Sequence, residues 1–335
     1  MTHRLTLGWK ASAEQFGPRQ LLDFAVLAER VGFESAWISD HFQPWRHTDG
    51  HSPFSIAWLA AAGERTQRLT LGTSVLTPTF RYHPSIVAQA FATLGVMYPD
   101  RIILGIGTGE SMNEAPVIGI EWPEPRERFR RLSEAVKLIR RLWTEDFVEH
   151  DGEYYRVRGA TVYDRPERPV PIYVAATGEV AARFAGRQAD GFICTSGKGM
   201  ELYRDRLLPA VREGAGAAGR DYDAIEKTIE LKVAYDTDRA RALADTRIWA
   251  ALALPAEEKV GVHSPKEIEE RARTVQNPER RWMVSCDPEE HVEQIAPYVE
   301  LGFTHLVFHH PGEDQAGFLR RYAGQILPRL RERWG

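Results

Sequence analysis

Residues 35–41 read Ser-Ala-Trp-Ile-Ser-Asp-His, an apolar run that ends directly on an acid and an imidazole. Three further apolar runs end in polar groups: the run at 69–75 on Thr-Ser-Val, the run at 102–110 on Gly-Thr-Gly-Glu, and the run at 191–198 on Thr-Ser-Gly-Lys. Polar groups gathered at the C-terminal ends of several strands are typical of the catalytic face of a parallel α/β barrel. This pattern predicts both an architecture and the place of a site.

Strand-like and helix-like segments alternate along all 335 residues, which is typical of βα units and a parallel sheet. Eight strands are expected, at 5–10, 35–39, 69–75, 101–106, 171–176, 191–195, 228–235 and 304–309. We therefore predict an α/β fold, a (β/α)8 TIM barrel forming a single domain over 1–335, with insertions near 147–170 and 254–278. The first insertion should contain a β-hairpin that turns at Asp151-Gly152.

The composition indicates an ordinary soluble protein with a substantial core, since 43% of the residues are hydrophobic. The net charge of −4 gives no basic excess for binding nucleic acid or an anionic membrane. Cys194 and Cys286 are too few for a disulfide framework, so we expect a cytoplasmic protein. No apolar leader and no membrane helix is expected. Cys194, within an apolar strand, is expected to be a core residue rather than a catalytic thiol.

The glycine-rich string Gly105–Glu110 suggests a dinucleotide-binding loop, but we reject that interpretation. Glu110 stands where the motif requires glycine, and we expect residues 111–116 to separate the string from any helix. Two interpretations remain open. The glycines serve a loop that needs positive φ, or they let the backbone approach a flat ligand at which Glu110 is aimed.

His41 is the candidate with the most specific chemistry. An imidazole can take a proton from an alcohol, and the neighbouring Asp40 can bias its tautomer. The alternative is a hydrogen-bonded core histidine. Trp45, in the loop that follows, can pack on a substrate or cofactor ring, or merely within the loop. The histidines around the last strand, His305, His309 and His310, have no metal-ligand spacing, and no metal site is expected.

Basic side chains are scattered along the second half of the chain. Lys198 follows Thr195 and Ser196 just past a strand end, Lys259 lies in the long insertion, and Arg280 and Arg281 come after it. Hydroxyls, backbone amides and two or three cations would form a phosphate cradle if they converged. Each cation by itself is more typical of a solvated surface charge.

Four segments, 10–16, 39–46, 72–79 and 191–198, resemble the deazaflavin-dependent glucose-6-phosphate dehydrogenases of the bacterial luciferase-like superfamily. The resemblance covers nearly the whole chain. It implies a (β/α)8 barrel, a homodimer and coenzyme F420, an 8-hydroxy-5-deazaflavin. It also implies the activity: C1 of a sugar 6-phosphate, with glucose 6-phosphate first, is oxidised to the lactone and the hydride goes to C5 of the deazaflavin.

The same resemblance implies a role for each matching residue. His41 is a candidate base on the C1 hydroxyl and Glu14 a second one, Glu110 supplies the proton of the deazaflavin N1, and Trp45 packs at the reacting sugar. The cofactor would contact Asp40, Ser74, Val75, Thr77, Gly107, Thr108, Gly109 and Asn113, with a cis peptide between Ser74 and Val75. The sugar phosphate would be held by Thr195, Lys198, Lys259 and Arg281, with Arg280 as the neighbouring alternative.

One segment departs from the family pattern. Thr177 and Gly178 follow the fifth strand, where the family usually has a glycine pair near the cofactor, and the loop 109–116 also differs after its first residues. Another hexose 6-phosphate, such as fructose 6-phosphate, or another alcohol therefore stays open as the substrate. A flavin-dependent luciferase-like monooxygenase and a non-enzymatic cofactor-binding barrel are the competing interpretations.

Overall fold

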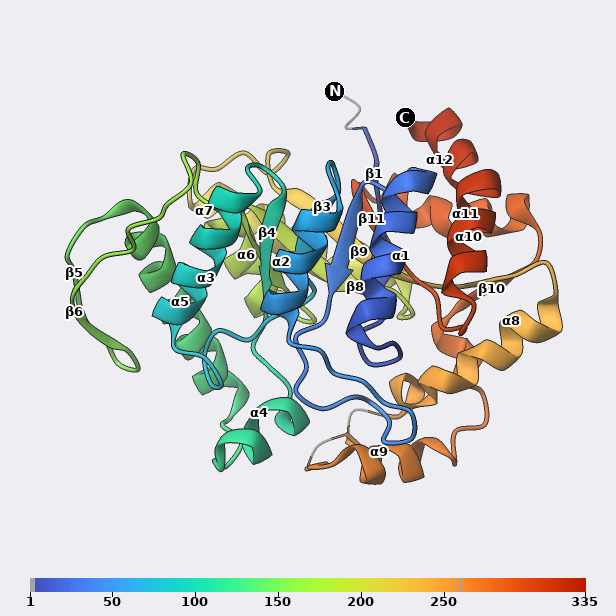
Figure 1. The fold of residues 1–335 in the computed structure, drawn as a ribbon, viewed down its shortest axis with the longest axis horizontal. Coiled ribbons are helices and arrows are strands. Elements are labelled where there is room, and N and C mark those ends of the chain that lie inside the picture. The colour runs from blue at the N-terminus through green and yellow to red at the C-terminus, as the bar shows by residue number, and fades with distance from the viewer. Residues whose placement is uncertain (1–3, 256, 260) are drawn as a thin grey trace.

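The computed structural model describes residues 4–255, 257–259 and 261–335, and it contains a parallel barrel wrapped by helices (Figure 1). The barrel strands are β1 (Thr6–Ala11), β2 (Ser35–Ile38), β3 (Thr70–Thr73), β4 (Ile102–Ile106), β7 (Ile172–Ala175), β8 (Gly191–Thr195), β9 (Glu226–Tyr235) and β11 (His305–His309). They pair in this order, and β11 pairs with β1, so the sheet closes on itself. The predicted barrel fold is confirmed. A short strand, β10 (Met283–Ser285), pairs in parallel with the C-terminal end of β9.

Helices cover the outside of the barrel. They are α1 (Pro18–Val31), α2 (Ser55–Arg65), α3 (Pro84–Met97), α5 (Pro125–Thr144), α6 (Glu179–Gln188), α7 (Leu208–Ala217), α10 (Pro288–Glu300), α11 (Gln315–Gln325) and α12 (Leu327–Trp334). α1 ends at Gly32, whose φ of +103° is the left-handed conformation that glycine adopts freely. α10 begins as its sequence predicts, with Asp287 accepting a hydrogen bond from the Glu290 amide.

Alternate residues of each strand face the barrel interior, which is apolar only in its middle. Trp37, Ile103, Tyr173, Ile193 and Val307 form that middle layer. The large rings fit because glycines face them: a Cβ on Gly72 would lie 2.8 Å from the Trp37 ring. At the C-terminal ends of the strands the interior is charged instead, with Lys10, Glu230, Lys232 and His309 all nearly inaccessible to solvent.

The two insertions differ in structure. The first contains the predicted hairpin, formed by the antiparallel strands β5 (Val148–Asp151) and β6 (Arg156–Ala160), which stands away from the barrel (Figure 1). The second contains α9 (Pro265–Ala272), between α8 (Arg239–Asp245) with its 3-10 extension Thr246–Ala253 and the 3-10 turn Pro278–Arg281. The Glu269 carboxylate on α9 accepts hydrogen bonds of 2.8 Å from the amides of His47 and Thr48. The insertion therefore covers the loop that follows β2.

One local prediction was wrong. The helix α4 (Ser111–Ile118) begins directly after Glu110, so no irregular segment separates it from the glycine string. Pro116 misled the prediction, because a proline inside a helix leaves the carbonyl four residues earlier without its amide donor. Here that carbonyl, on Met112, accepts a 2.6 Å hydrogen bond from the Gln43 side chain instead. The dinucleotide motif stays excluded, since Glu110 replaces its last glycine.

Within the described part of the chain, none of the helices combines the length and apolar character that a bilayer crossing demands.

Candidate active site

Three of the predicted catalytic side chains meet at the C-terminal face of the barrel. Nδ1 of His41, just past β2, lies 2.5 Å from Oε1 of Glu14, which follows β1. Nε2 of the same ring lies 3.7 Å from Oε2 of Glu110, at the start of α4. The side chains of Glu14, His41 and Glu110 are 4%, 17% and 44% exposed, so accessibility increases along the row.

The proton affinity of His41 is set by these carboxylates. Burial opposes a charge on the ring, but Glu14 and Glu110 outweigh it and raise the pKa of His41 to about 9. Burial likewise opposes a charge on Glu14, yet the adjacent His41 holds the pKa of that carboxyl far below its usual range. At neutral pH the two groups therefore form an imidazolium–carboxylate pair.

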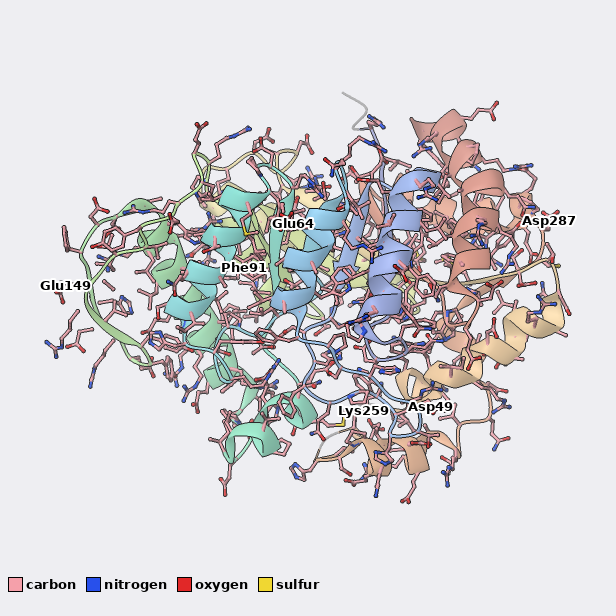
Figure 2. The ribbon with its side chains drawn as sticks, viewed as in Figure 1. Asp49, Glu64, Phe91, Glu149, Lys259 and Asp287 are labelled. Atoms are coloured by element: carbon pink, nitrogen blue, oxygen red, sulfur yellow. The ribbon has the colours of Figure 1, made fainter. Side chains whose placement is uncertain are left out.

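Trp45 links this row to the basic residues. Its ring centroid lies 6.4 Å from that of His41, in an edge-on arrangement. Nζ of Lys259 lies 5.7 Å from the Trp45 ring, within cation–π range. Figure 2 shows Lys259 near α4 and α9, on the side of the barrel where the strands end. The loop after β2 thus carries an imidazole and an indole on one side of the site.

Asp40 is committed to a buried network. Its carboxylate accepts hydrogen bonds from the Ser55 hydroxyl at 2.6 Å, the Tyr82 hydroxyl at 2.9 Å and Nη2 of Arg81 at 2.8 Å. Nε of Arg81 also contacts the Glu114 carboxylate at 3.2 Å. Asp40 therefore fixes the loop that carries His41, and its contact with a cofactor stays a prediction. Sequence reasoning missed Arg81 and Glu114, because neither lies near Asp40 along the chain.

The loops after β3 and β4 pack closely together and leave backbone atoms uncovered by side chains. The peptide between Ser74 and Val75 is cis, as the resemblance implies. Lys10 donates hydrogen bonds to the Ser74 carbonyl at 2.9 Å and to its hydroxyl at 2.6 Å. A Cβ on Gly107 would lie 2.8 Å from the Val75 side chain, so the backbone must stay uncovered there. The φ of +84° at Gly109 confirms the interpretation of the string as a loop that needs positive φ, and the approach of a flat ligand stays a prediction.

Asn113 orients Glu110. Its Oδ1 accepts hydrogen bonds from the amides of Phe42 and Gln43 at 2.8 and 2.9 Å, and its Nδ2 donates one of 3.1 Å to the Glu110 carboxylate. Asn113 is buried, so these bonds tie α4 to the loop that carries His41. Four other predicted cofactor residues lie on the same face of the barrel: Thr77 is buried beside Gly109, Thr108 follows β4, and the exposed Thr177 precedes Gly178, the N-cap of α6.

Three of the predicted basic residues, Lys198, Lys259 and Arg281, lie close enough together to influence one another's charge. Burial and then the neighbouring Arg281 lower the pKa of Lys259 to about 8, and the same two causes lower the pKa of Lys198. A Cβ on Gly197 would lie 2.7 Å from the Arg281 carbonyl, which shows how closely the loop after β8 packs on that residue. Among the described residues, Lys198, Lys259 and Arg281 form no ion pair with a carboxylate.

Two further details refine this set of cations. Arg280 donates from Nη2 to the Ala253 carbonyl, whereas Nε of Arg281 is buried and has no hydrogen-bond partner among the described residues. Arg281, rather than Arg280, therefore has an N–H group available to a ligand. Lys232, which sequence reasoning missed, contributes to lowering the pKa of Lys259 and so belongs to the same cluster. Thr195 on β8 pairs in register with Glu230 on β9, two residues before Lys232.

Comparisons with known proteins agree with this geometry. A family model described as luciferase-like monooxygenase matches residues 5–305. A protein of Intrasporangium calvum named F420-dependent glucose-6-phosphate dehydrogenase is 60% identical, over 98% of this chain and 99% of its own. One of the same name from Nocardia farcinica is 59% identical, over 98% of both chains.

Solved structures agree as well. An F420-dependent secondary alcohol dehydrogenase in complex with an F420-acetone adduct superposes with a TM-score of 0.91 at 34% identity, over 96% of this chain and 98% of that one. A coenzyme F420-dependent tetrahydromethanopterin reductase from Methanopyrus kandleri, at 22% identity over 98% and 99% of the chains, has a TM-score of 0.81 and shows the fold alone. The chain therefore belongs to the luciferase-like family and, within it, to the F420-dependent glucose-6-phosphate dehydrogenases.

Proposed function

We propose that this protein oxidises C1 of glucose 6-phosphate to 6-phosphogluconolactone and delivers the hydride to C5 of coenzyme F420. The observation that carries the proposal is the placement of three cations, Lys198, Lys259 and Arg281, on the same barrel face as the Glu14–His41 pair, with no carboxylate partner among the residues that the structure describes. A phosphate needs such cations, and an alcohol carbon needs such a base. The names of the relatives support the same assignment.

The residues after β3, β4 and β7 fit a flat deazaflavin. Val75 offers an apolar side chain, and Gly107 offers uncovered backbone beside it. Ser74, Thr77, Thr108, Gly109, Asn113, Thr177 and Gly178, together with the Asp40 loop, would surround the ring. When bound there, F420 supplies a carbon, C5, that accepts a hydride, and a ring nitrogen, N1, that accepts a proton.

The Glu14–His41 pair would take the proton of the C1 hydroxyl. Because the pair already holds a proton at neutral pH, it acts as a base after that proton has left. Nε2 is the accessible ring nitrogen and faces Glu110 rather than Glu14. His41 is thus placed to receive the hydroxyl proton directly, and Glu14 to share it through Nδ1.

Glu110 would hold the second proton, at the carboxylate oxygen that also accepts from Asn113. Its partial exposure lets that proton exchange with solvent between turnovers. Trp45 would pack against the sugar ring between His41 and Lys259. The phosphate cations anchor the far end of the sugar, so that binding energy remote from C1 positions the reacting carbon.

The test is an absorbance measurement. Enzyme and F420 are mixed with glucose 6-phosphate, fructose 6-phosphate and other hexose 6-phosphates, and loss of the deazaflavin absorbance band is followed. Bleaching with glucose 6-phosphate but not with glucose is expected. Cofactor binding without bleaching by any sugar phosphate would overturn the proposal. Other alcohols, and then reduced FMN with oxygen consumption, would test the alternative activities.

We also infer that the protein is a single-domain homodimer in the cytoplasm. The side chains of Ile86, Val96 and Met97 on α3 are apolar and exposed, which supports a self-association surface. Light scattering coupled to size exclusion tests this inference, and a monomer at micromolar concentration would contradict it.

A further inference from the structure

The C-terminal face of the barrel is divided by charge. β3, β4 and β7 end in small uncharged residues facing inward, namely Ser74, Gly107 and Ala175, and Glu110 in the loop after β4 is the charged exception on this side. The other five strands bring charged or basic side chains: Lys10 from β1, His41 after β2, Lys198 after β8, Glu230 and Lys232 from β9, and His309 from β11. A flat, largely uncharged ring suits the first half, and a sugar phosphate suits the second.

The order of the strands fixes what lies between the base and the phosphate site. From β2, which carries His41, the wall of the barrel runs through β1, β11 and β9 to β8, which carries Lys198. The inward residues along that path are Lys10, His309, Glu230 and Lys232. A hexose with C1 at His41 and its phosphate at Lys198 therefore lies with its ring over these four side chains.

Glu230 is the central group of this path. Its carboxylate lies 3.4 Å from each of Nζ of Lys10, Nζ of Lys232 and Nδ1 of His309. Burial opposes its charge, but the two lysines and His309 outweigh burial and hold the pKa of Glu230 well below its usual range. Glu230 is therefore ionised. Its three contacts are longer than the 2.7–2.9 Å of a good charge-assisted hydrogen bond.

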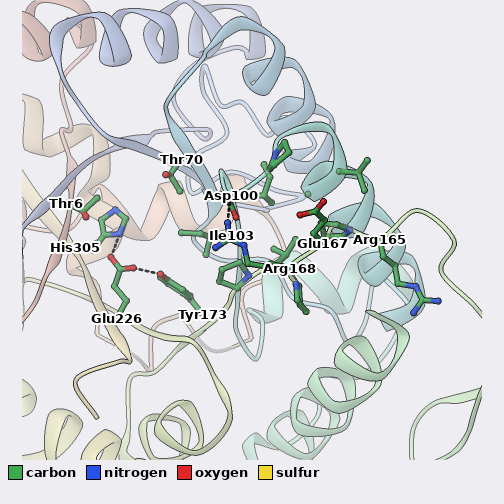
Figure 3. A pocket seen from close by; sticks show the side chains of 18 residues that line it. Thr6, Thr70, Asp100, Ile103, Arg165, Glu167, Arg168, Tyr173, Glu226 and His305 are labelled. Carbon is green, nitrogen blue, oxygen red and sulfur yellow. Dashed lines mark hydrogen bonds and ion pairs between the residues drawn. The ribbon is translucent and has the colours of Figure 1, made fainter. Parts of the chain in front are cut away.

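An equivalent pair at the N-terminal ends of the same two strands contains a carboxylate with a hydrogen-bond donor on each oxygen. Glu226 on β9 accepts a 2.8 Å hydrogen bond at Oε1 from Nδ1 of His305 on β11, and Tyr173 donates to its other oxygen (Figure 3). These residues line a cavity of about 710 Å³ at the N-terminal ends of the strands. Because every oxygen of Glu226 has a close partner, this carboxylate needs no ligand.

We propose that Glu230 and Lys232 determine which sugar the protein accepts, because they form hydrogen bonds with the secondary hydroxyls of the hexose ring. This inference rests on the proposed function. A hydroxyl over this pair can donate to Glu230 and accept from Lys232 at the same time. A deoxy sugar or an epimer that lacks the hydroxyl at that position forfeits both hydrogen bonds and leaves Glu230 with its 3.4 Å contacts to the two lysines and His309, so the site discriminates against it.

The experiment compares kcat/KM for glucose 6-phosphate with that for 2-deoxyglucose, mannose, allose and galactose 6-phosphates, in the wild type and in Glu230→Gln. The wild type should discriminate against at least one analogue about tenfold or more. In Glu230→Gln, kcat/KM should fall more for glucose 6-phosphate than for the analogue, so the ratio of the two values should approach one. The Kd for F420 should not change. Lys232→Met, which keeps the length of the side chain, should reduce the same ratio.

Glu226→Gln is the matched control, because it removes a partly exposed, histidine-bonded carboxylate from the same strand about 13 Å away. It should leave the ratio unchanged. Equal loss for all sugars in Glu230→Gln would mean that Glu230 only balances charge, and that result overturns the inference. A wild type that uses every analogue equally would overturn it too. Failure of the wild type to bleach F420 with any sugar phosphate would instead strike the proposed function.

Discussion

Nδ1 of His41 and Oε1 of Glu14 lie 2.5 Å apart, and the Glu14 side chain is nearly inaccessible to solvent. The carboxylate does more than orient the ring, because it also holds a proton on it: the pKa of His41 is raised to about 9. A base that is protonated at neutral pH must first lose that proton. The pH dependence of the reaction should therefore report on this contact.

We expect kcat/KM for glucose 6-phosphate to rise with pH between 6 and 8, approaching tenfold per unit, because only the fraction of enzyme with neutral His41 is competent. In Glu14→Gln this limb should move to lower pH, since burial without the carboxylate lowers the pKa of His41. Steady-state rates across the pH range, on F420-saturated enzyme, give both curves. A limb that stays in place in Glu14→Gln would separate His41 from the rise.

His41→Ala should lose turnover and keep cofactor binding. Removal of a general base costs about 10²–10⁴-fold in kcat, whereas the Kd for F420 should change little because the ring surface is built by other loops. Steady-state rates and an F420 titration by fluorescence measure the two effects separately. Unchanged turnover would remove His41 from the mechanism.

Lys198→Ala should raise the KM for glucose 6-phosphate strongly, because it removes one of three cations that have no carboxylate partner among the described residues. Oxidation of non-phosphorylated glucose, if it is detectable at high concentration, should be little affected. Activity assays with both sugars supply the comparison. An equal loss with both would show that Lys198 does not act through the phosphate.

Lys259 should make phosphate binding sensitive to mild alkali. Burial, with Arg281 beside it, lowers the pKa of Lys259 to about 8, so the ammonium loses its charge as the pH rises through that value. The KM for glucose 6-phosphate should increase accordingly. In Lys259→Arg the increase should disappear, since a guanidinium keeps its charge throughout this range. A KM that rises alike in both proteins would contradict the assignment.

Arg81→Met should destabilise the fold by about 3–5 kcal/mol, because it leaves the buried carboxylates of Asp40 and Glu114 without the cation that both contact. Glu114→Gln is the matched control and should be milder: burial raises the pKa of Glu114 to about 7, so about half of this group is already neutral at pH 7. Urea unfolding at pH 7 compares the variants. Similar stabilities for the two variants would argue against Arg81 as the residue that joins the His41 loop to α4.

Much of the fold was accessible from the sequence, because its signals are local. The alternation of apolar runs and amphipathic stretches predicted the eight barrel strands, and the residues around Asp287 predicted the start of α10. The start of α4 was missed for a reason that is not local: the carbonyl freed by Pro116 is satisfied by Gln43, about seventy residues earlier in the chain. No rule based on neighbouring residues could supply that donor.

The sequence by itself determined which chemical groups stand at the ends of strands: His41 after β2, Glu110 after β4 and Lys198 after β8. Only the tertiary structure decided which of these groups meet. Closing the barrel places β11 between β9 and β1, and brings Glu230 near Lys10 although 220 positions separate them in the chain. The physical reason is that strand propensity and capping act over a few residues, whereas the distance between two charged groups depends on how every strand between them packs.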